Sequence, residues 1–372
     1  MKIAFDTFGC DHGKSGLGSY LINFVNNIPA DCPYKIELFG SEIDRYTYKS
    51  EVEKTYVSVN IPDTLKAEQK WHKTRMNLFL MKSDYDVVIF PAPENVLPVK
   101  FYKKSVVVLN SIYSVTVNNL KRRKRKLFKK GLERVDVIIA SSQYIKNDLV
   151  KNGFDEKKIF VVYNGIDHKM FFPSLDTDSE FVEIKPFAIK KPYFIYGSRL
   201  SGKEKKHIEL IKAFNLFKKN TGYPHRLVLA GNDGDYSEEI KQAAYNSEYS
   251  SDIFITGYFP FESFAKLYTG SSACIFPSEN EGVGLPILES MACGIPVLCS
   301  SKGALKEAGG DAPIYFDSNN IEEIAANMQL IVDNKEVYQN KVDAGLNRAN
   351  KFNWKSTVDE TFKLIEKLFP SK

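Results

Sequence analysis

The chain has 372 residues, which is too long for one ordinary hydrophobic core and fits two domains. Hydrophobic residues make up 43% and charged residues 26%, so disordered and fibrous classes are excluded. No apolar run reaches the roughly 18 residues that a membrane-spanning helix needs, and the net charge is a modest +5. The first residues, MKIAFDTFG, are typical of a strand rather than of a secretory signal, so we expect a cytoplasmic protein.

The first half of the chain alternates short apolar runs with helical patterns, which is typical of βαβ units and a parallel sheet. Strands are predicted at residues 2–5, 35–39, 87–90, 105–109, 135–140 and 159–162. Residues 173–192 are interrupted by prolines and lack periodicity, and they are predicted to be a linker between two domains.

The second half repeats the pattern. Strands are predicted at residues 193–196, 226–230, 253–256, 273–276, 296–298 and 313–316. A final helix near residues 357–368 has one apolar stripe, and we expect it to pack on the first domain. The predicted fold is α/β, with two doubly wound Rossmann-like domains at 1–172 (plus helix 356–372) and 193–355, facing each other across a ligand cleft.

The most informative stretch is FPSENEGVGLPILESMACGIPV, residues 276–297. A strand ends at Phe276, and Pro286 suits the first turn of a helix, where a missing N–H costs nothing. The start of this helix points backbone donors and partial positive charge at the crevice, which favours a phosphate or a sugar oxygen. Gly282 and Gly284 would let a ligand approach the backbone.

Two carboxylates flank this helix start. Glu281 lies in the loop, and Glu289 lies about one turn into the helix. Each carboxylate can accept hydrogen bonds from pairs of hydroxyls, as a sugar and a ribose both require.

This block resembles the E-x7-E signature of glycosyltransferase family 4, whose members have the two-Rossmann GT-B fold. Three other segments are similar to that family. They are VVYNGID at 161–167, ITGY at 255–258, which ends at Tyr258, and ASSQ at 140–143.

The resemblance implies that Glu281 holds hydroxyls of a donor sugar and that Glu289 holds the ribose. It also implies that the paired cations after the second domain's first strand are Arg199 and Lys205, which would stabilise the pyrophosphate leaving group. Because this loop is about one residue longer than usual, Lys203 or Lys206 could take the place of Lys205. Further donor contacts are expected along the helix start and the nucleotide-facing strand, at Gly282, Val283, Gly284, Leu285 and Tyr258.

In the first domain, the segment GLGSY at 16–20 resembles the family's glycine loop, and Gly16 and Gly18 are expected near the donor. The preceding segment, GCDHGKS at 9–15, nearly matches a Walker phosphate loop but has three residues between its glycines instead of four. A phosphate-loop NTPase that depends on Lys14 is therefore an alternative. His12 is a further candidate site residue.

The family often carries a His-Asp pair after a first-domain strand, where this chain has Asn110 and Ser111. Asn110 could still hydrogen-bond the donor. The departure also leaves open a sugar-nucleotide-binding protein that has lost catalysis.

Residues 121–130 (KRRKRKLFKK), from Lys121 to Lys130, hold eight basic residues. If residues 118–134 are helical, Leu120, Leu127, Phe128 and Leu132 share one face. Such a helix suits an anionic membrane surface or a phosphorylated lipid acceptor, and aromatic residues are too sparse there for nucleic-acid binding.

The function that the resemblance implies is retaining transfer of a hexose from a nucleoside diphosphate sugar, such as GDP-mannose or a UDP-sugar, to a glycan or lipid-linked acceptor. No cofactor and no metal ion are expected. The five cysteines form no C-x-x-C pair, so a zinc or redox site of that type is not expected either.

Overall fold

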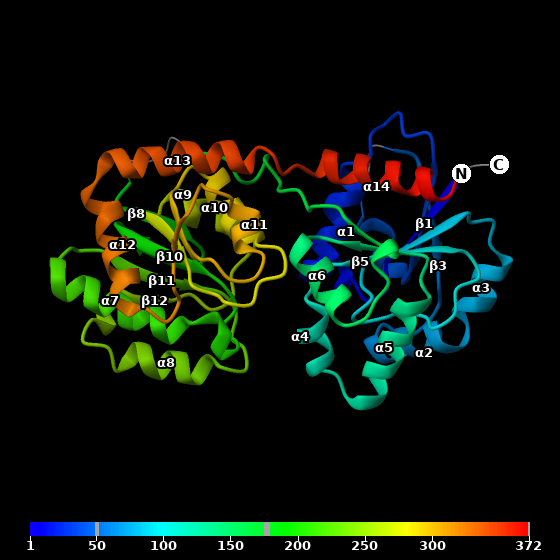
Figure 1. Ribbon diagram of the computed structural model, residues 1–372, viewed down its shortest axis with the longest axis horizontal. Helices are drawn as coiled ribbons and strands as arrows, with labels where there is room; N and C mark the ends of the chain where they lie inside the picture. Colours follow the sequence, from blue (N-terminus) through cyan, green and yellow to red (C-terminus); the bar gives the residue numbers. More distant parts are fainter. Residues whose placement is uncertain (49–51, 175–178, 371–372) are drawn as a thin grey trace. The chain divides into compact units, whose positions relative to one another are not determined.

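The computed structural model describes residues 1–48, 52–174 and 179–370. The chain divides into two compact units. The first comprises Met1–Gly165 and Asn353–Lys372, and the second comprises Ile166–Phe352. Each unit is an α/β layer structure with helices on both faces of its sheet (Figure 1).

The first unit contains a seven-stranded sheet in which every neighbouring pair is parallel. Its strands are β1 (Lys2–Asp6), β2 (Lys35–Gly40), β3 (Lys54–Ser58), β4 (Val87–Phe90), β5 (Lys104–Leu109), β6 (Val137–Ala140) and β7 (Ile159–Val161), in the order β3-β2-β1-β4-β5-β6-β7. Strand β3 was not predicted, because its KTYVS sequence is short and largely polar and lies at the edge of the sheet, where no residue of it is fully buried.

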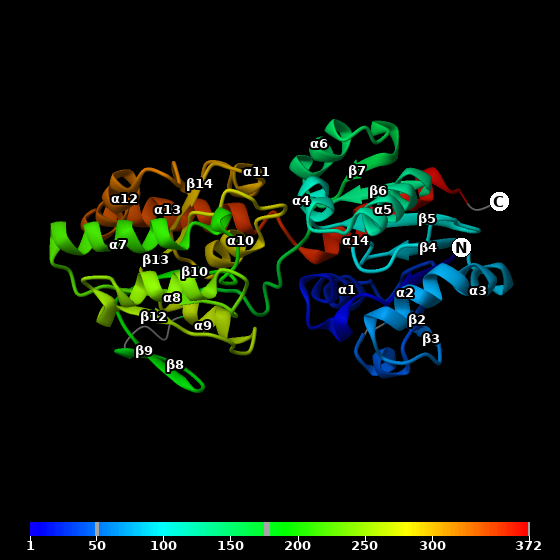
Figure 2. The same cartoon turned by 90° about the horizontal axis from the view of Figure 1, so that it is seen from below.

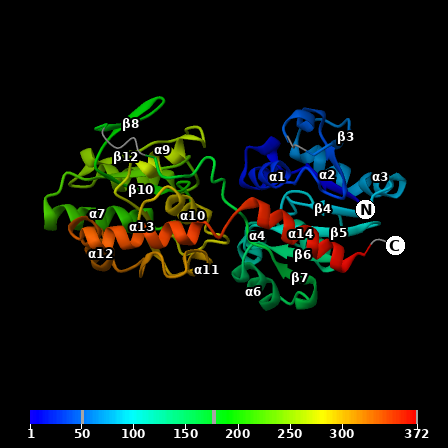
Figure 3. The ribbon, with the colours of Figure 1, turned by 90° about the horizontal axis from the view of Figure 1, so that it is seen from above.

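Two helices cover one face of this sheet, α1 (Gly16–Asn26) and α14 (Trp354–Leu368). Alternate strand residues, such as Ile3 and Phe5, pack on them, as the period of two in a strand requires. Val358, Phe362 and Ile365 of α14 are buried there, so the predicted C-terminal helix does pack on the first unit (Figure 3). The remaining helices of this unit are α2 (Leu65–Thr74), α3 (Met76–Lys82), α4 (Tyr113–Asn118), α5 (Arg122–Arg134) and α6 (Gln143–Lys151).

The second unit repeats the plan with a six-stranded parallel sheet. Its strands are β10 (Tyr193–Gly197), β11 (Arg226–Ala230), β12 (Ile253–Ile255), β13 (Ala273–Phe276), β14 (Val297–Ser300) and β15 (Ile314–Phe316), in the order β12-β11-β10-β13-β14-β15. Its helices are α7 (His207–Thr221), α8 (Ser237–Tyr245), α9 (Ser263–Thr269), α10 (Leu285–Ala292), α11 (Leu305–Gly309), α12 (Ile321–Asp333) and α13 (Lys335–Ala349).

The predicted linker at 173–192 is instead partly a β-hairpin of the second unit. Strand β8 (Phe181–Ile184) pairs antiparallel with β9 (Phe187–Lys190), and Figure 2 shows the hairpin at the margin of that unit. Val182, Ile184 and Ile189 are buried in the second core, which is why this short segment is ordered. The boundary between units falls after Gly165 rather than at 172. Residues 175–178 of the predicted linker lie outside the described residues.

Each sheet has one point where the strand order reverses. It lies between β1 and β4 in the first unit and between β10 and β13 in the second. Doubly wound sheets bind ligands beyond the carboxyl ends of the strands at this point. The loops after β1, β4, β10 and β13 are therefore the places where function is expected.

Candidate functional site

The loop after β13 leads into helix α10 as predicted. Gly284 precedes the helix in a left-handed conformation (φ 82°) that favours glycine, and Pro286 lies in the first turn. A Cβ atom on Gly284 would also lie 3.0 Å from Cβ of Ala308. Conformation and packing therefore both require glycine here.

An ion pair joins the loops that follow β10 and β13. Nζ of Lys205 lies 2.5 Å from Oε1 of Glu281, and the two side chains are 21% and 14% exposed. Lys205 belongs to the short 3-10 helix η4 (Lys203–Lys205). The pair thus spans the reversal point of the second sheet.

Backbone contacts fix both members of the pair. The N–H of Glu279 donates to the carbonyl of Glu204 (2.9 Å), and the hydroxyl of Tyr196 donates to the carbonyl of Lys205 (2.9 Å). On the other side, the carbonyl of Glu281 accepts a hydrogen bond from the N–H of Ala304 (2.8 Å).

The structure separates the three candidate lysines by their contacts. Lys205 pairs with Glu281, whereas Nζ of Lys206 donates to Oδ1 of Asn319 (2.8 Å) and pairs with Glu279 at 3.4 Å. Nζ of Lys203 lies 5.9 Å from the centre of the Tyr236 ring. Lys205 is therefore the lysine that lies beside the predicted sugar-binding carboxylate.

Arg199 lies in the same loop but is exposed. Its Nε donates to the carbonyl of Asp233 (3.2 Å), after strand β11. The guanidinium is thus available at the carboxyl edge of the sheet, and no hydrogen bond or ion pair joins it to the Lys205–Glu281 pair within the described part of the chain.

Glu289 is buried in α10, with 9% of its surface exposed. Burial raises the pKa of its carboxyl to about 8. Across residues 1–48, 52–174 and 179–370, no hydrogen bond to its side chain is found. Burial thus favours the protonated form of this carboxyl, and a ligand that donates hydrogen bonds to it would offset the cost of its charge.

The other residues predicted to contact the donor differ in burial and in how they lie relative to the Lys205–Glu281 pair. Gly282, Val283 and Leu285 are partly buried along the same loop and helix start. Tyr258 follows β12 and is 75% exposed, and no ring contact or hydrogen bond brings it to the Lys205–Glu281 pair in the described residues.

In the first unit, the two glycines of the predicted glycine loop have different surroundings. Gly16 is the first residue of α1, is exposed, and has open space where a Cβ atom would lie. Gly18 is buried, and a Cβ atom there would lie 2.1 Å from the carbonyl oxygen of Cys10. Gly18 therefore has a packing role, because α1 approaches the preceding loop closely.

These surroundings predict opposite outcomes for two matched variants. Gly18→Ala should lower the unfolding midpoint by several degrees, because the new methyl group overlaps backbone atoms that cannot move cheaply. Gly16→Ala should leave the midpoint unchanged and, if the turn contacts the donor, should raise the donor KM. Thermal unfolding and steady-state kinetics on both proteins check this. A destabilised Gly16→Ala protein would contradict the assignment.

The loop at 9–15 does not have the form of a phosphate loop. The N–H of Gly9 donates to Oε2 of Glu68 (3.0 Å), and the N–H groups of Gly13 and Lys14 donate to the carbonyls of Cys10 and Asp11. A Walker loop needs such amides to be free for phosphate. Here they are occupied, in one case by a carboxylate that would repel phosphate.

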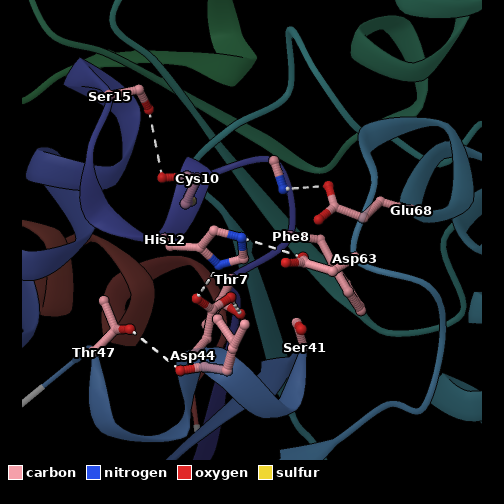
Figure 4. Close-up of polar contacts among 12 residues, drawn as sticks. Thr7, Phe8, Cys10, His12, Ser15, Ser41, Asp44, Thr47, Asp63 and Glu68 are labelled. Carbon is pink, nitrogen blue, oxygen red and sulfur yellow. Dashed lines mark hydrogen bonds and ion pairs between the residues drawn. The ribbon is translucent and has the colours of Figure 1, made fainter.

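His12 lies between two carboxylates (Figure 4). Its Nδ1 is 2.8 Å from Oδ1 of Asp44, and its Nε2 is 3.2 Å from Oδ1 of Asp63. Burial would lower the pKa of His12, but hydrogen bonding to Asp44 and the charges of Asp44, Asp63 and Asp11 raise it overall. Both ring nitrogens are thus engaged.

Asn110 takes part in a polar network at the carboxyl edge of the first sheet. Its Oδ1 accepts hydrogen bonds from Oγ of Ser141 (2.5 Å) and from Nδ2 of Asn164 (2.8 Å), while its Nδ2 is buried without a partner. Sequence reasoning placed Asn110 at this edge but did not foresee the network.

Glu94, in the loop after β4, was missed by the sequence analysis. Its Oε1 accepts a hydrogen bond from Oγ of Ser111 (2.5 Å), and its Oε2 is buried without a partner. Burial raises the pKa of this carboxyl to about 7. Its place a few residues after a buried strand was the signal that could have found it.

The predicted basic helix is shorter than expected. Helix α5 begins at Arg122, so Leu120 lies outside it, and Leu127 is 40% exposed. Only Phe128 and Leu132 of the predicted apolar face are buried. All eight basic residues between Lys121 and Lys130 are exposed. In the part of the chain that the structure describes, no helix is long and apolar enough to cross a membrane.

Two family models together match most of the chain. A model described as "Glycosyltransferase Family 4" matches residues 15–169, and one described as "Glycosyl transferases group 1" matches residues 178–348. The chain belongs to glycosyltransferase family 4, group 1. It is therefore a transferase, and the binding-only and NTPase alternatives are set aside.

Relatives and solved structures agree with this membership. An Escherichia coli protein named O-antigen chain mannosyltransferase B is 25% identical, over 97% of this chain and 98% of its own. Sucrose-phosphate synthase from Thermosynechococcus elongatus has a TM-score of 0.77 at 17% identity, with full coverage of both chains. Anabaena HepE in complex with UDP and glucose has a TM-score of 0.73 at 18% identity, over 99% of this chain and all of its own. These structural matches establish that this family 4 protein has the GT-B fold.

Proposed function

We propose that this glycosyltransferase moves a hexose from a nucleoside diphosphate sugar to a hydroxyl of a glycan or lipid-linked acceptor, with retention of anomeric configuration. The observation that carries the proposal is the Lys205–Glu281 pair beside the start of α10, with the carboxyl of Glu289 buried one turn further on. A cation, a carboxylate and a helix start at one sheet edge suit a pyrophosphate flanked by a sugar and a ribose.

Each group then has a chemical role. Glu281 accepts hydrogen bonds from donor-sugar hydroxyls, and Glu289 accepts them from the ribose. Lys205 and Arg199 balance the negative charge that grows on the pyrophosphate as the glycosidic bond breaks. The departing phosphate oxygen takes the proton of the attacking acceptor hydroxyl, so neither a separate protein base nor a metal ion is needed.

Among donors, GDP-mannose is our first choice because the Escherichia coli relative, which is matched over 98% of its own length, is named a mannosyltransferase. UDP-glucose is the second, because the structurally similar HepE is described in complex with UDP-glucose. A thermal-shift panel of nucleoside diphosphates and their sugars tests this choice, since a ligand that binds only the folded state raises the unfolding midpoint. The matching donor should then support transfer in the presence of EDTA. Loss of transfer in EDTA, restored by Mg²⁺, would contradict the metal-independent mechanism.

We also propose that the basic segment 121–130 contacts an anionic membrane surface. Helix α5 has basic residues in its first turn and no acidic ones, an arrangement that the helix dipole disfavours. Nearby anionic headgroups would offset this cost, and each exposed Lys or Arg near such a surface contributes about 1 kcal/mol.

The membrane contact predicts a selective loss on charge reversal. Arg123→Glu with Lys126→Glu should lower partitioning onto vesicles with anionic lipid by at least about tenfold, because two charges near the surface change from positive to negative. Lys212→Glu with Lys219→Glu makes the same charge change at exposed positions of α7 and should have little effect. Co-sedimentation with anionic and with neutral vesicles measures both. Equal losses in the two double variants would mean that net charge, not this helix, drives binding.

A further inference from the structure

The loop between β1 and α1 has an unusual backbone. Four of its residues have positive φ values: Gly9 (76°), Asp11 (49°), His12 (50°) and Gly13 (83°). Glycine adopts this region freely, but Asp11 and His12 do so at a cost in free energy. Such strain persists only where surrounding contacts hold it, and it is common at functional sites.

The two carboxylates that face His12 favour a protonated ring. Asp44 faces Nδ1 at 2.8 Å and Asp63 faces Nε2 at 3.2 Å. A neutral imidazole has a single N–H and can donate to only one of these carboxylates, leaving a lone pair facing the other. An imidazolium donates a hydrogen bond to Asp44 and carries the positive charge that attracts Asp63. The two distances therefore define an ionic clamp, formed by His12, Asp44 and Asp63.

The clamp joins three separate segments. His12 lies in η1 (Asp11–Gly13), Asp44 lies in the 3-10 helix η2 (Glu42–Tyr46), and Asp63 precedes α2. Asp44 is buried, and its Oδ2 accepts a second hydrogen bond from Oγ1 of Thr7 (3.0 Å) at the end of β1. Figure 4 shows these groups gathered around His12.

One other group near the clamp changes charge in the same range: the pKa of His72, which pairs with Asp6 at the end of β1, is also raised, and this titration is shared by the wild-type protein and by variants of His12. Burial raises the pKa of Cys10, Tyr48 and Tyr56, so they stay neutral near neutral pH. Asp11, from the same loop, adds negative charge that also favours the imidazolium. As pH rises through the raised pKa of His12, the ring loses the charge that attracts both carboxylates, so the clamp is present at low pH and is lost on the alkaline side.

The clamped loop also determines where α1 begins. The N–H of Gly13 donates to the carbonyl of Cys10 (3.0 Å), and Gly18 packs on both residues. Oγ of Ser15 accepts a hydrogen bond from the N–H of Gly18 (3.2 Å), which caps the helix. Any shift of η1 would therefore shift the exposed Gly16 turn, at the reversal point of the first sheet.

We propose that His12 is a positioning residue, which, through its two carboxylate partners, holds the β1–α1 loop in the conformation that presents the Gly16 turn to substrate. The inference rests on the proposed transferase function for its catalytic consequence. The clamp itself is independent of that function.

His12→Asn removes the charge of the ring but keeps the backbone conformation, because asparagine tolerates the left-handed region. Its kcat/KM for transfer should fall about tenfold at pH 6, and the difference from the wild-type protein should disappear by about pH 9. Using the ratio of the two proteins cancels other titrations that they share, including that of Glu289. A ratio that stays constant with pH would overturn the proposal.

Asp63→Asn gives the opposite outcome. A neutral His12 can donate from Nδ1 to Asp44 and accept at Nε2 from the new amide, so activity should persist at alkaline pH where the wild-type protein loses it. An alkaline loss as steep as that of the wild-type protein would count against the clamp.

Hydrogen exchange at the amides of Gly13 and Lys14 supplies a readout that needs no substrate. After correction for the intrinsic pH dependence, protection should decline from pH 6 to 9 in the wild-type protein and be low throughout in His12→Asn. If these changes occur and no donor is ever used, the transferase proposal has failed and the clamp stands. If protection is the same in both proteins, the clamp is refuted whatever the activity.

Discussion

Lys205→Ala is expected to lower kcat for sugar transfer by two to three orders of magnitude. The ammonium lies beside Glu281 at the reversal point of the second sheet, where the leaving pyrophosphate would gather charge. Removing one preorganised electrostatic contact of this kind typically costs about 10²–10³ in kcat. The unfolding midpoint should change little, because the pair is partly exposed and such pairs contribute about 1 kcal/mol or less.

Lys203→Ala is the matched control. Lys203 lies two positions away in the same 3-10 helix, but its Nζ lies over the Tyr236 ring instead of beside Glu281. Initial-rate kinetics on both variants, with the donor that gives the largest thermal shift, provide the test. Losses of similar size would show that the whole basic loop, and not this one ion pair, acts on the pyrophosphate.

Glu281→Ala and Arg199→Ala should likewise abolish transfer with little change in the unfolding midpoint, and full activity in either variant would refute its assignment.

Glu289→Gln is expected to stabilise the protein while weakening donor binding. Burial raises the pKa of the Glu289 carboxyl from its ordinary value of 4.5 to about 8 in the folded protein. The folded state therefore binds the proton more tightly, and stability falls as pH rises through this window. At about 1.4 kcal/mol per pKa unit, the wild-type protein should lose a few kcal/mol between pH 5 and 9 that the glutamine variant keeps.

The same substitution should raise the donor KM at least about tenfold, because an amide replaces a carboxylate that accepts hydrogen bonds from two ribose hydroxyls. Thermal unfolding from pH 5 to 9 and donor titrations measure the two effects. Glu279→Gln, a partly exposed carboxylate that pairs with Lys206, should leave the wild-type pH dependence of stability in place. If Glu289→Gln also leaves it in place, burial of Glu289 is not its cause.

Strands could be predicted well because their runs of valine, isoleucine and phenylalanine are buried on both faces. Residues 226–230 and 273–276 match β11 and β13 at both ends. The β8–β9 hairpin could not be predicted in the same way, because only Val182, Ile184 and Ile189 reach the core and prolines interrupt the segment. A short strand that packs on the core with only one face has few apolar residues, so its sequence shows only a weak alternating pattern.

The candidate site also has parts that could be predicted from the sequence and parts that could not. The E-x7-E block placed Glu281 and Glu289 correctly relative to α10, because both lie in one continuous segment. Choosing Lys205 over its neighbours required the contact with Glu281, which is 76 positions away in the chain. The partners of His12 come from two further segments, and no local pattern joins residues 12, 44 and 63. Long-range packing is the information that the sequence alone did not supply.

The hydrogen bond from Glu279 N–H to the carbonyl of Glu204 has a consequence for how such loops can diverge. Both partners are backbone atoms, so the bond does not depend on a particular side chain. A residue can therefore be inserted between Arg199 and Lys205 without displacing the Lys205 ammonium, provided that the turn before η4 accommodates the extra residue. Gly202 (φ 61°) and Lys206 (φ 58°) flank η4, and both have positive φ values, which mark the turns where the chain changes direction. In relatives whose turn is longer or shorter, the lysine equivalent to Lys205 is therefore better identified by this backbone hydrogen bond between the two loops than by its distance in sequence from the arginine.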